Sequence, residues 1–116
     1  MPFASVADSI AFEKEMPWVD RDVPKSIFSL LSRTAGKFPN HNAISFQLQS
    51  GPTDKAETFT WSQLHQKTAQ AANLFRSLGI GRDDVVAYVL PNSNETVLAL
   101  LGGATAGIVS PVNPLL

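Results

Sequence analysis

The stretch FTWSQLHQKTAQAANLFRSLGIGRDDVVAYVLPNS, residues 59–93, decides the fold. Thr60 is a helix-capping residue, and Gln63 stands three positions later, where the reciprocal partner of a capping box belongs. Gly79 ends the predicted helix, because glycine adopts a left-handed backbone without steric cost. Between these limits one face carries apolar and small residues at helical spacing: Leu64, Thr68, Ala71, Ala72, Phe75 and Leu78.

A wholly apolar run follows this helix at residues 85–90, directly after an acidic pair. A strand that is apolar on both faces must be covered on both faces, which is typical of a parallel sheet between helix layers. Leaving one face exposed to solvent would cost about 1.5–3 kcal/mol for each large side chain. The sequence therefore predicts the α/β class, as a partial three-layer αβα unit that contains a β-hairpin and parallel strands.

The hairpin is expected upstream of the helix. Residues 43–48 alternate and are rich in β-formers, residues 49–56 are dense in turn formers, and residues 57–60 can return antiparallel. Downstream, Ser93 is a good cap for a further helix, Gly107 ends it, and a last strand begins at Ile108.

The first part of the chain has no clean period. We interpret residues 1–22 as a leader with a short helix near residues 11–16, packed onto the domain through Phe12 and Trp18. A helix is then predicted from Pro24, because proline is favoured in a first turn. Its apolar stripe comprises Ile27, Phe28, Leu31, Ala35 and Phe38.

Composition and net charge exclude several classes of function. The 116 residues are 44% hydrophobic and 16% charged with a net charge of −1, which indicates one globular domain at most. This charge gives no basis for binding nucleic acid or an anionic membrane. The chain has no cysteine, which excludes disulfides and thiolate metal sites. With no secretory signal in the first residues either, we expect a cytoplasmic location.

Several motifs resemble parts of known functional sites, but each is better explained by a structural role. The glycines of residues 79–81 close a helix and precede a strand, the reverse of a dinucleotide-binding turn. The acidic pair at residues 83–84 also precedes its strand, unlike the acidic pocket of a phosphorylated receiver domain. His65 lies at the border of the apolar stripe and His41 in a turn, so we predict no catalytic, cofactor-binding or metal-binding residue.

Two further patterns resemble a glycosylation site and a membrane span, and we predict neither. Residues 94–96 match a glycosylation sequon but open a predicted helix. Residues 96–116 carry no charge, yet glycine and proline interrupt them and the apolar part is shorter than the ~20 residues of a membrane span. We expect no membrane span. We predict that the small residues there let a helix lie close to a sheet.

An ordered set of features carries a family resemblance. It comprises Phe59-Thr60-Trp61, a helix with Ala71, Ala72 and Leu74, Leu78-Gly79 with Gly81, Asp84-Val85-Val86-Ala87, Leu90-Pro91-Asn92-Ser93 and Pro111-Val112-Asn113-Pro114. Over roughly residues 24–116 the chain resembles the N-terminal part of the AMP-forming, adenylate-forming enzymes, the acyl-CoA synthetase and luciferase superfamily. The ending SPVNPLL is more similar to acyl- or aryl-CoA ligases than to the peptide-synthetase branch.

The resemblance implies a parent enzyme of fatty acid metabolism that uses ATP, Mg²⁺ and coenzyme A. Such a parent activates a carboxylic acid as acyl-AMP and then forms the CoA thioester. The family's phosphate loop, adenine motif, ribose-binding Asp and catalytic Lys all lie downstream of these residues. We therefore expect residues 23–116 to be an incomplete, non-catalytic N-terminal subdomain that binds no cofactor alone.

The expected partner is the remainder of the parent chain. The last strand ends without a successor, so an exposed edge could also drive homodimerisation or aggregation. The alternative is a free-standing α/β binding or interaction module, which would cover Val109, Val112, Leu115 and Leu116 internally.

Overall fold

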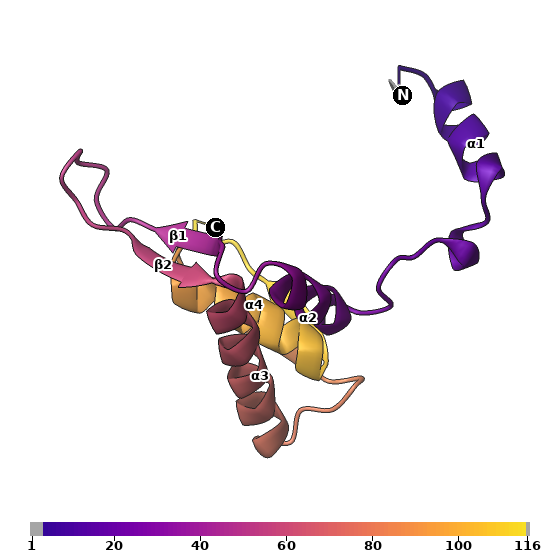
Figure 1. Cartoon of the computed structure of the whole chain (residues 1–116). Helices are drawn as coiled ribbons and strands as arrows, with labels where there is room; N and C mark the ends of the chain where they lie inside the picture. Colours follow the sequence, from indigo (N-terminus) through magenta and orange to yellow (C-terminus); the bar gives the residue numbers. More distant parts are fainter. Residues whose placement is uncertain (1–3, 116) are drawn as a thin grey trace.

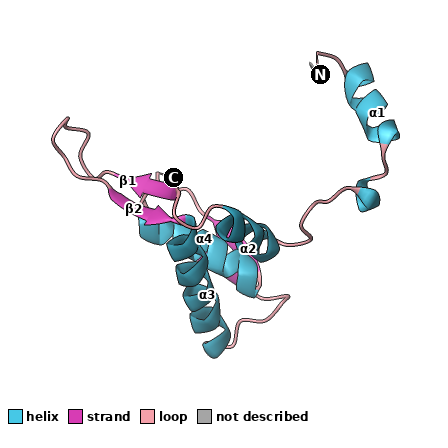
Figure 2. Ribbon diagram, viewed as in Figure 1, coloured by secondary structure: helices cyan, strands magenta, loops and turns pink. Residues whose placement is uncertain are grey.

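The computed structural model describes residues 4–115 and combines helices with two small sheets (Figures 1 and 2). In chain order the elements are α1 (Val6–Glu15), a 3₁₀ turn η1 (Trp18–Asp20), α2 (Ile27–Lys37), β1 (Asn42–Phe46), β2 (Glu57–Thr60), α3 (Trp61–Ser77), β3 (Val85–Tyr88), α4 (Asn94–Ala106) and β4 (Ile108–Pro111). Helices α2, α3 and α4 pack together beside the sheets, and α1 lies apart from them.

The start and end of α3 follow the predicted signals. Thr60 Oγ1 accepts a hydrogen bond from the Gln63 N–H at 3.3 Å, and the Thr60 N–H donates to Gln63 Oε1 at 2.9 Å. Gly79 has a φ of +93° just beyond the helix, in the left-handed region. The capping box and the glycine stop are therefore both confirmed.

The buried stripe of α3 is shorter than predicted. Leu64, Thr68 and Ala72 are buried, whereas the side chain of Leu78 is 71% exposed. Leu78 is the C-cap residue, with φ −87° and ψ 4°, so it lies beyond the regular helix and its side chain leaves the buried face. The assignment of Leu78 to the core was wrong.

The β1–β2 hairpin and the β3–α4–β4 unit give the α/β class that the sequence predicted. β1 pairs antiparallel with β2, placing Ile44 opposite Phe59, and β3 pairs parallel with β4, placing Val86 opposite Val109. A parallel pair needs a crossover connection, and α4 supplies it. The two pairs form separate two-stranded sheets rather than one continuous sheet.

Glycines set how closely α4 approaches its neighbours. A Cβ on Gly102 would lie 2.6 Å from the Ala71 Cβ of α3, and a Cβ on Gly103 would lie 3.1 Å from Val109 Cγ2. One pair of glycines therefore brings α4 against both a helix and the β3–β4 sheet. The predicted close contact between small residues and a sheet is confirmed and extends to α3.

Only one face of the β3–β4 sheet is covered by the described residues. The burial of β3 alternates, and Val85 is 53% exposed, although the sequence indicated cover on both faces. The regular strand also ends at Tyr88, and Val89 and Leu90 beyond it are exposed. The apolar run predicts the strand but not which chain covers its outer face.

Helix α2 begins later than the proline signal indicated. Ser26 caps it by accepting a hydrogen bond from the Ser29 N–H at 3.1 Å, so Pro24 precedes the helix rather than joining its first turn. Leu31 is buried where α2 packs on α3. The predicted start at Pro24 was wrong because a serine cap lay two residues downstream.

The leader forms more helix than predicted and extends away from the other helices (Figure 1). α1 begins at Val6, because Ser5 and Asp8 form a capping box that the prediction near residues 11–16 missed. Trp18 is 71% exposed, so its predicted role as an anchor on the domain was wrong. Phe12 contacts Arg21 of the leader itself.

Candidate functional site

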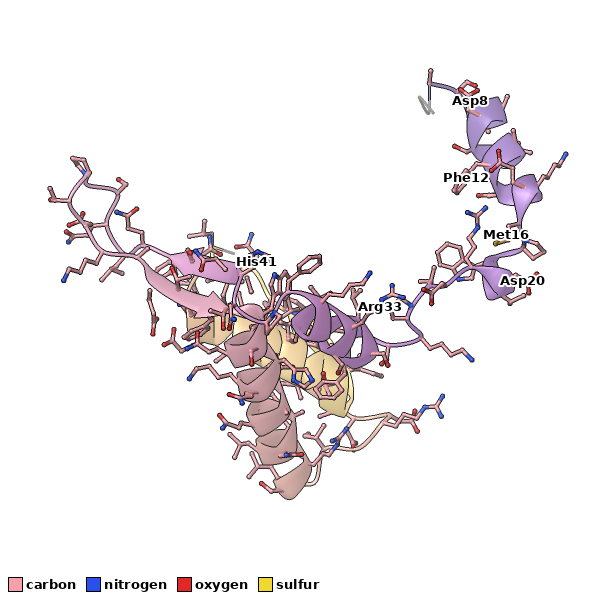
Figure 3. All side chains as sticks on the ribbon, viewed as in Figure 1. Asp8, Phe12, Met16, Asp20, Arg33 and His41 are labelled. Carbon is pink, nitrogen blue, oxygen red and sulfur yellow. The ribbon has the colours of Figure 1, made fainter. Side chains whose placement is uncertain are left out.

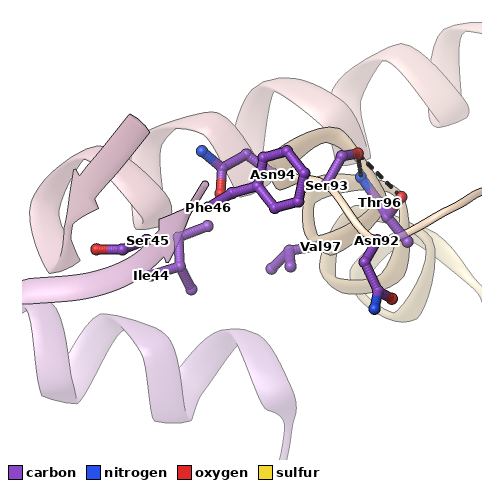
Figure 4. A pocket seen from close by; sticks show the side chains of 8 residues that line it. All are labelled: Ile44, Ser45, Phe46, Asn92, Ser93, Asn94, Thr96 and Val97. Atoms are coloured by element: carbon purple, nitrogen blue, oxygen red, sulfur yellow. Dashed lines mark hydrogen bonds between the residues drawn. The ribbon is translucent and has the colours of Figure 1, made fainter. Parts of the chain in front are cut away.

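A hollow lies between β1 and the start of α4 (Figure 4). It has a volume of about 300 Å³ and is open to solvent. Its walls are two short segments far apart in the sequence: Ile44, Ser45 and Phe46 from β1, and Asn92, Ser93, Asn94, Thr96 and Val97 from the α4 entry. The candidate site is therefore the junction of the hairpin with α4.

Asn94 fixes this junction. Its side chain is 2% exposed, and its Nδ2 donates to the Glu57 carbonyl at 3.1 Å and to Glu57 Oε2 at 3.0 Å. Glu57 lies in β2 opposite Phe46, so the bonds join α4 to the hairpin at the level of the hollow. A buried amide keeps such a position only when its hydrogen bonds are made.

The entry to α4 is ordered by its own cap. Ser93 Oγ accepts a hydrogen bond from the Thr96 N–H at 3.2 Å, and the Thr96 hydroxyl donates to the Pro91 carbonyl. Figure 4 shows these cap residues on the α4 side of the hollow. The predicted capping role of Ser93 is confirmed, and it accounts for Ser93 and Thr96 on this wall.

The chemistry of the hollow is limited to hydrogen bonding and apolar contact. None of its lining side chains is ionisable, so it offers no general acid, base or nucleophile paired with a base. A nucleotide triphosphate with Mg²⁺ needs cations near its phosphates and oxygen ligands for the metal. The lining residues therefore do not fit such a group by themselves.

The residues that the sequence singled out remain apart from one another. His65 of α3 stacks on Phe28 with 4.8 Å between ring centroids, and its Nε2 lies 2.9 Å from Ser32 Oγ. His41 lies between α2 and β1, 5.3 Å from the Phe38 ring. Both histidines thus make packing contacts between neighbouring elements, which agrees with the border and turn positions predicted for them.

The acidic pair and the sequon also have structural roles. Asp84 Oδ2 accepts a hydrogen bond from the Gly81 N–H at 2.7 Å, so it closes the turn before β3. The Asn94 amide of the sequon is used by Glu57 and buried, which supports treating that motif as a chance match. The Asn94–Glu57 link was missed, because no sequence pattern pairs residues 37 positions apart.

The described residues 4–115 contain no group of three or more His, Cys, Asp or Glu side chains placed to hold a metal ion. No helix among them has both the length and the apolar character to cross a bilayer. The predicted absence of catalytic, cofactor and metal residues stays a prediction.

A family comparison identifies the class of protein. The model of the AMP-binding enzyme family matches residues 31–116, which is most of the chain. The chain therefore belongs to the AMP-binding enzyme family, and the resemblance drawn from residues 24–116 is confirmed.

Curated relatives are much longer than this chain. It is 31% identical over 112 residues to a marinolic acid–CoA ligase of Pseudoalteromonas sp., covering 97% of this chain and 17% of the relative. It is 35% identical over 95 residues to a long-chain-fatty-acid–AMP ligase of Mycobacterium marinum, covering 81% and 15%. The chain thus spans about a sixth of the length of these relatives.

A solved structure agrees with these relatives. A Mycobacterium tuberculosis fatty acyl CoA synthetase matches with a TM-score of 0.66 and 28% identity, over 79% of this chain and 17% of that one. The fold of this chain is therefore that of a portion of a larger adenylate-forming enzyme.

Proposed function

We propose that this chain is the structural opening piece of the N-terminal domain of an AMP-forming acyl-CoA ligase, and that alone it catalyses neither half-reaction. Residues 23–116 form the incomplete subdomain in this proposal, and residues 1–22 the leader. The parent enzyme uses ATP, Mg²⁺ and coenzyme A to convert a carboxylic acid to acyl-AMP and then to its thioester. The proposal includes a cytoplasmic location, where ATP and coenzyme A are available.

The exposed surface of the chain is the observation that carries this proposal. A compact monomer of 12.5 kDa exposes about 6,200 Å². This chain exposes 8486 Å², and its exposed apolar side chains include Val85 of β3 and Ile108 of β4. A sheet face of this kind is ordinarily covered by other chain, and in a ligase that chain is the rest of the domain.

A role of the parent in fatty acid metabolism is part of this proposal and rests on the names of two relatives, while others are named for marinolic acid, acetyl-coenzyme A and anthranilate. The two are a fatty-acid–AMP ligase and, as a structural match, a fatty acyl CoA synthetase. The hollow at the hairpin junction is too open and too small to enclose a long acyl chain. In this proposal the chain supports the acyl and nucleotide sites from outside, and other residues of the parent make the contacts.

Calorimetric titration of the chain with Mg-ATP and with coenzyme A tests the non-catalytic role. We expect no saturable heat for either ligand up to millimolar concentration, because the lining of the hollow is uncharged. Circular dichroism of the same sample checks that the helices are formed. Saturable micromolar binding of either ligand by this chain would overturn the proposal and favour a free-standing binding module.

A further inference from the structure

An apolar groove lies where the leader joins α2, along the segment between Asp20 and Arg33 (Figure 3). It consists of two adjoining hollows, of about 380 and 540 Å³. We call this feature the base groove and define it by its apolar side chains, which come from the leader, the connecting segment and the start of α2: Trp18, Val19, Val23, Pro24, Ile27 and Leu30.

The described residues leave the base groove open to solvent. Its valine, isoleucine, leucine and tryptophan side chains are between 43% and 88% exposed. A single exposed apolar side chain needs no explanation, whereas several that line one groove mark an interaction surface. The groove therefore fits a partner that presents apolar side chains of its own.

The rim of the base groove has an uncompensated positive charge. Arg33 is paired with Asp22, with 3.1 Å between Nη1 and Oδ2, and Arg21 donates to the Phe12 carbonyl at 2.7 Å. Lys25 lies on both hollows and forms no ion pair within residues 4–115. A partner segment with a carboxylate beside its apolar residues would therefore complement the groove in charge.

The relatives show that a leader of this kind belongs to long chains. The match to the marinolic acid–CoA ligase covers 97% of this chain, so it must include most of residues 1–22. A match to an acetyl-coenzyme A synthetase of Chromobacterium violaceum, 29% identical over 114 residues, includes them as well. These matches cover only 17% and 16% of the two relatives, so most of each relative lies outside the match.

A solved structure extends this likeness to the course of the leader. An anthranilate CoA ligase matches with a TM-score of 0.67 at 23% identity, over 87% of this chain and 18% of that one. A match of that extent must reach into residues 1–22, because residues 23–116 alone are a smaller share of the chain. Part of the leader therefore takes its course within a fold that a much longer chain shares, and further residues of such a chain are the simplest occupant of the base groove.

We propose that the base groove is a docking site for the rest of the parent ligase. This inference rests on the proposed function, because the occupant is a segment of the parent outside residues 1–116. The docked segment presents apolar side chains to the groove and a carboxylate to Lys25. Docking there ties the leader to a distant part of the parent, at a place separate from the outer face of the β3–β4 sheet.

The chain has no cysteine, so a single introduced thiol can report whether the groove is covered. Ile27→Cys places a thiol in the groove, and Leu48→Cys places one in the hairpin loop, where Leu48 is 84% exposed. Each variant is labelled with a maleimide in the isolated chain and in a chimera, in which this chain replaces the matched segment of the marinolic acid–CoA ligase. Peptide mass spectrometry follows each thiol, and the protection is the ratio of the rate in the isolated chain to the rate in the chimera.

We expect a protection of at least about tenfold for Ile27→Cys, because a docked segment excludes the reagent except during local opening. Leu48→Cys should show no protection, and the chimera should retain the ligase activity of the relative. An active chimera without protection at Ile27→Cys, or with equal protection at both thiols, would overturn this inference and leave the proposed function standing. An inactive chimera would count against the proposed function, and the inference would fall with it.

The isolated chain distinguishes the other occupants. If its Ile27→Cys thiol is labelled slowly at every concentration, the leader itself covers the groove. If labelling slows as the concentration of the chain rises, a second copy covers it. Either result would contradict docking of the parent.

Charge reversal tests the carboxylate of the docked segment. Lys25→Glu should lower the protection of Ile27→Cys by about threefold or more, because like charges then face each other across the groove. Lys55→Glu in the exposed hairpin loop makes the same change in net charge and should leave the protection unchanged. Equal effects of the two substitutions would rule out an acidic occupant at Lys25.

Discussion

Gly79 and Gly36 offer a comparison between two glycines with equal space around them. A Cβ built on either residue meets nothing within 4 Å. Gly36 lies inside α2, whereas Gly79 has a φ of +93° after α3. Any difference between alanine substitutions at the two positions therefore reports backbone conformation and not crowding.

We expect Gly79→Ala to lower the free energy of unfolding by about 1–2 kcal/mol, the cost of a left-handed alanine. Gly36→Ala should raise it by up to about 1 kcal/mol, because alanine is the better helix former. Urea unfolding followed by circular dichroism measures both. Equal effects of the two substitutions would show that Gly79 does not need its left-handed backbone.

Asn94 can be tested by an isosteric change. Asn94→Asp replaces the donor that faces the Glu57 carbonyl and carboxylate with an acceptor, so we expect a loss of about 1–3 kcal/mol in unfolding free energy. Acidification should reduce this loss, because a protonated carboxyl can donate again. Asn73→Asp on the exposed side of α3 is the control and should change stability by less than about 0.5 kcal/mol. Equal losses at both sites would remove the structural role of Asn94.

At the scale of elements, α3 and its C-cap carry two leucines that differ in burial, so they show whether stability depends on burial or only on apolar character. We expect Leu64→Ala to cost about 2–5 kcal/mol of unfolding free energy, because Leu64 is 2% exposed between helices. Leu78→Ala should stay within about 0.5 kcal/mol, because its side chain is largely exposed. Chemical denaturation of both variants measures the two free energies of unfolding. A large loss for Leu78→Ala would show that Leu78 belongs to the core.

The cap of α1 makes a pH-dependent prediction. The hydrogen bond from the Ser5 hydroxyl, followed by that from the Ser5 N–H, lowers the pKa of Asp8 below its usual 3.8. A lowered pKa in the folded state means that the cap stabilises α1 above pH 3.8. This stabilisation is lost as the pH falls through the lowered value.

We expect Ser5→Ala to move the pKa of Asp8 up toward 3.8 and to reduce the helix content of α1. An NMR titration of the Asp8 carboxyl carbon measures the shift. Ser9→Ala on the same helix is the control and should leave the pKa of Asp8 low. A pKa of Asp8 that stays low without the Ser5 hydroxyl would contradict the capping explanation.

Elements with local signals were the predictable part of this fold. The capping box at Thr60, the Ser93 cap, the Gly79 stop and the hairpin were each predicted from residues near in sequence. The errors arose where a local signal competed with another, as when Ser26 rather than Pro24 began α2. The hollow at the hairpin junction was not predictable, because it depends on the contact of Asn94 with Glu57 across the fold.

At the scale of the whole molecule, the apolar pattern of β3 predicted cover that these residues do not supply. Hydrophobic periodicity reports how a strand is buried in the complete protein, and here the chain spans about a sixth of its relatives. Among the described residues the buried apolar side chains are two leucines and two alanines: Leu31, Leu64, Ala72 and Ala106. The chain therefore has a small core beside a large exposed apolar surface.

This balance predicts weak and incompletely cooperative unfolding. We expect a free energy of unfolding below about 5 kcal/mol, the lower end for complete domains. The urea m-value should lie toward the low end of about 1–3 kcal/mol/M, because less surface is newly exposed on unfolding. A hydrophobic dye should bind the native chain at the β3–β4 face, and Val85→Lys should reduce that binding without lowering stability, since Val85 is already 53% exposed. Steep two-state unfolding above 5 kcal/mol with no dye binding would mean that the outer sheet face is covered after all, and the proposed dependence on a larger parent would then lose its physical basis.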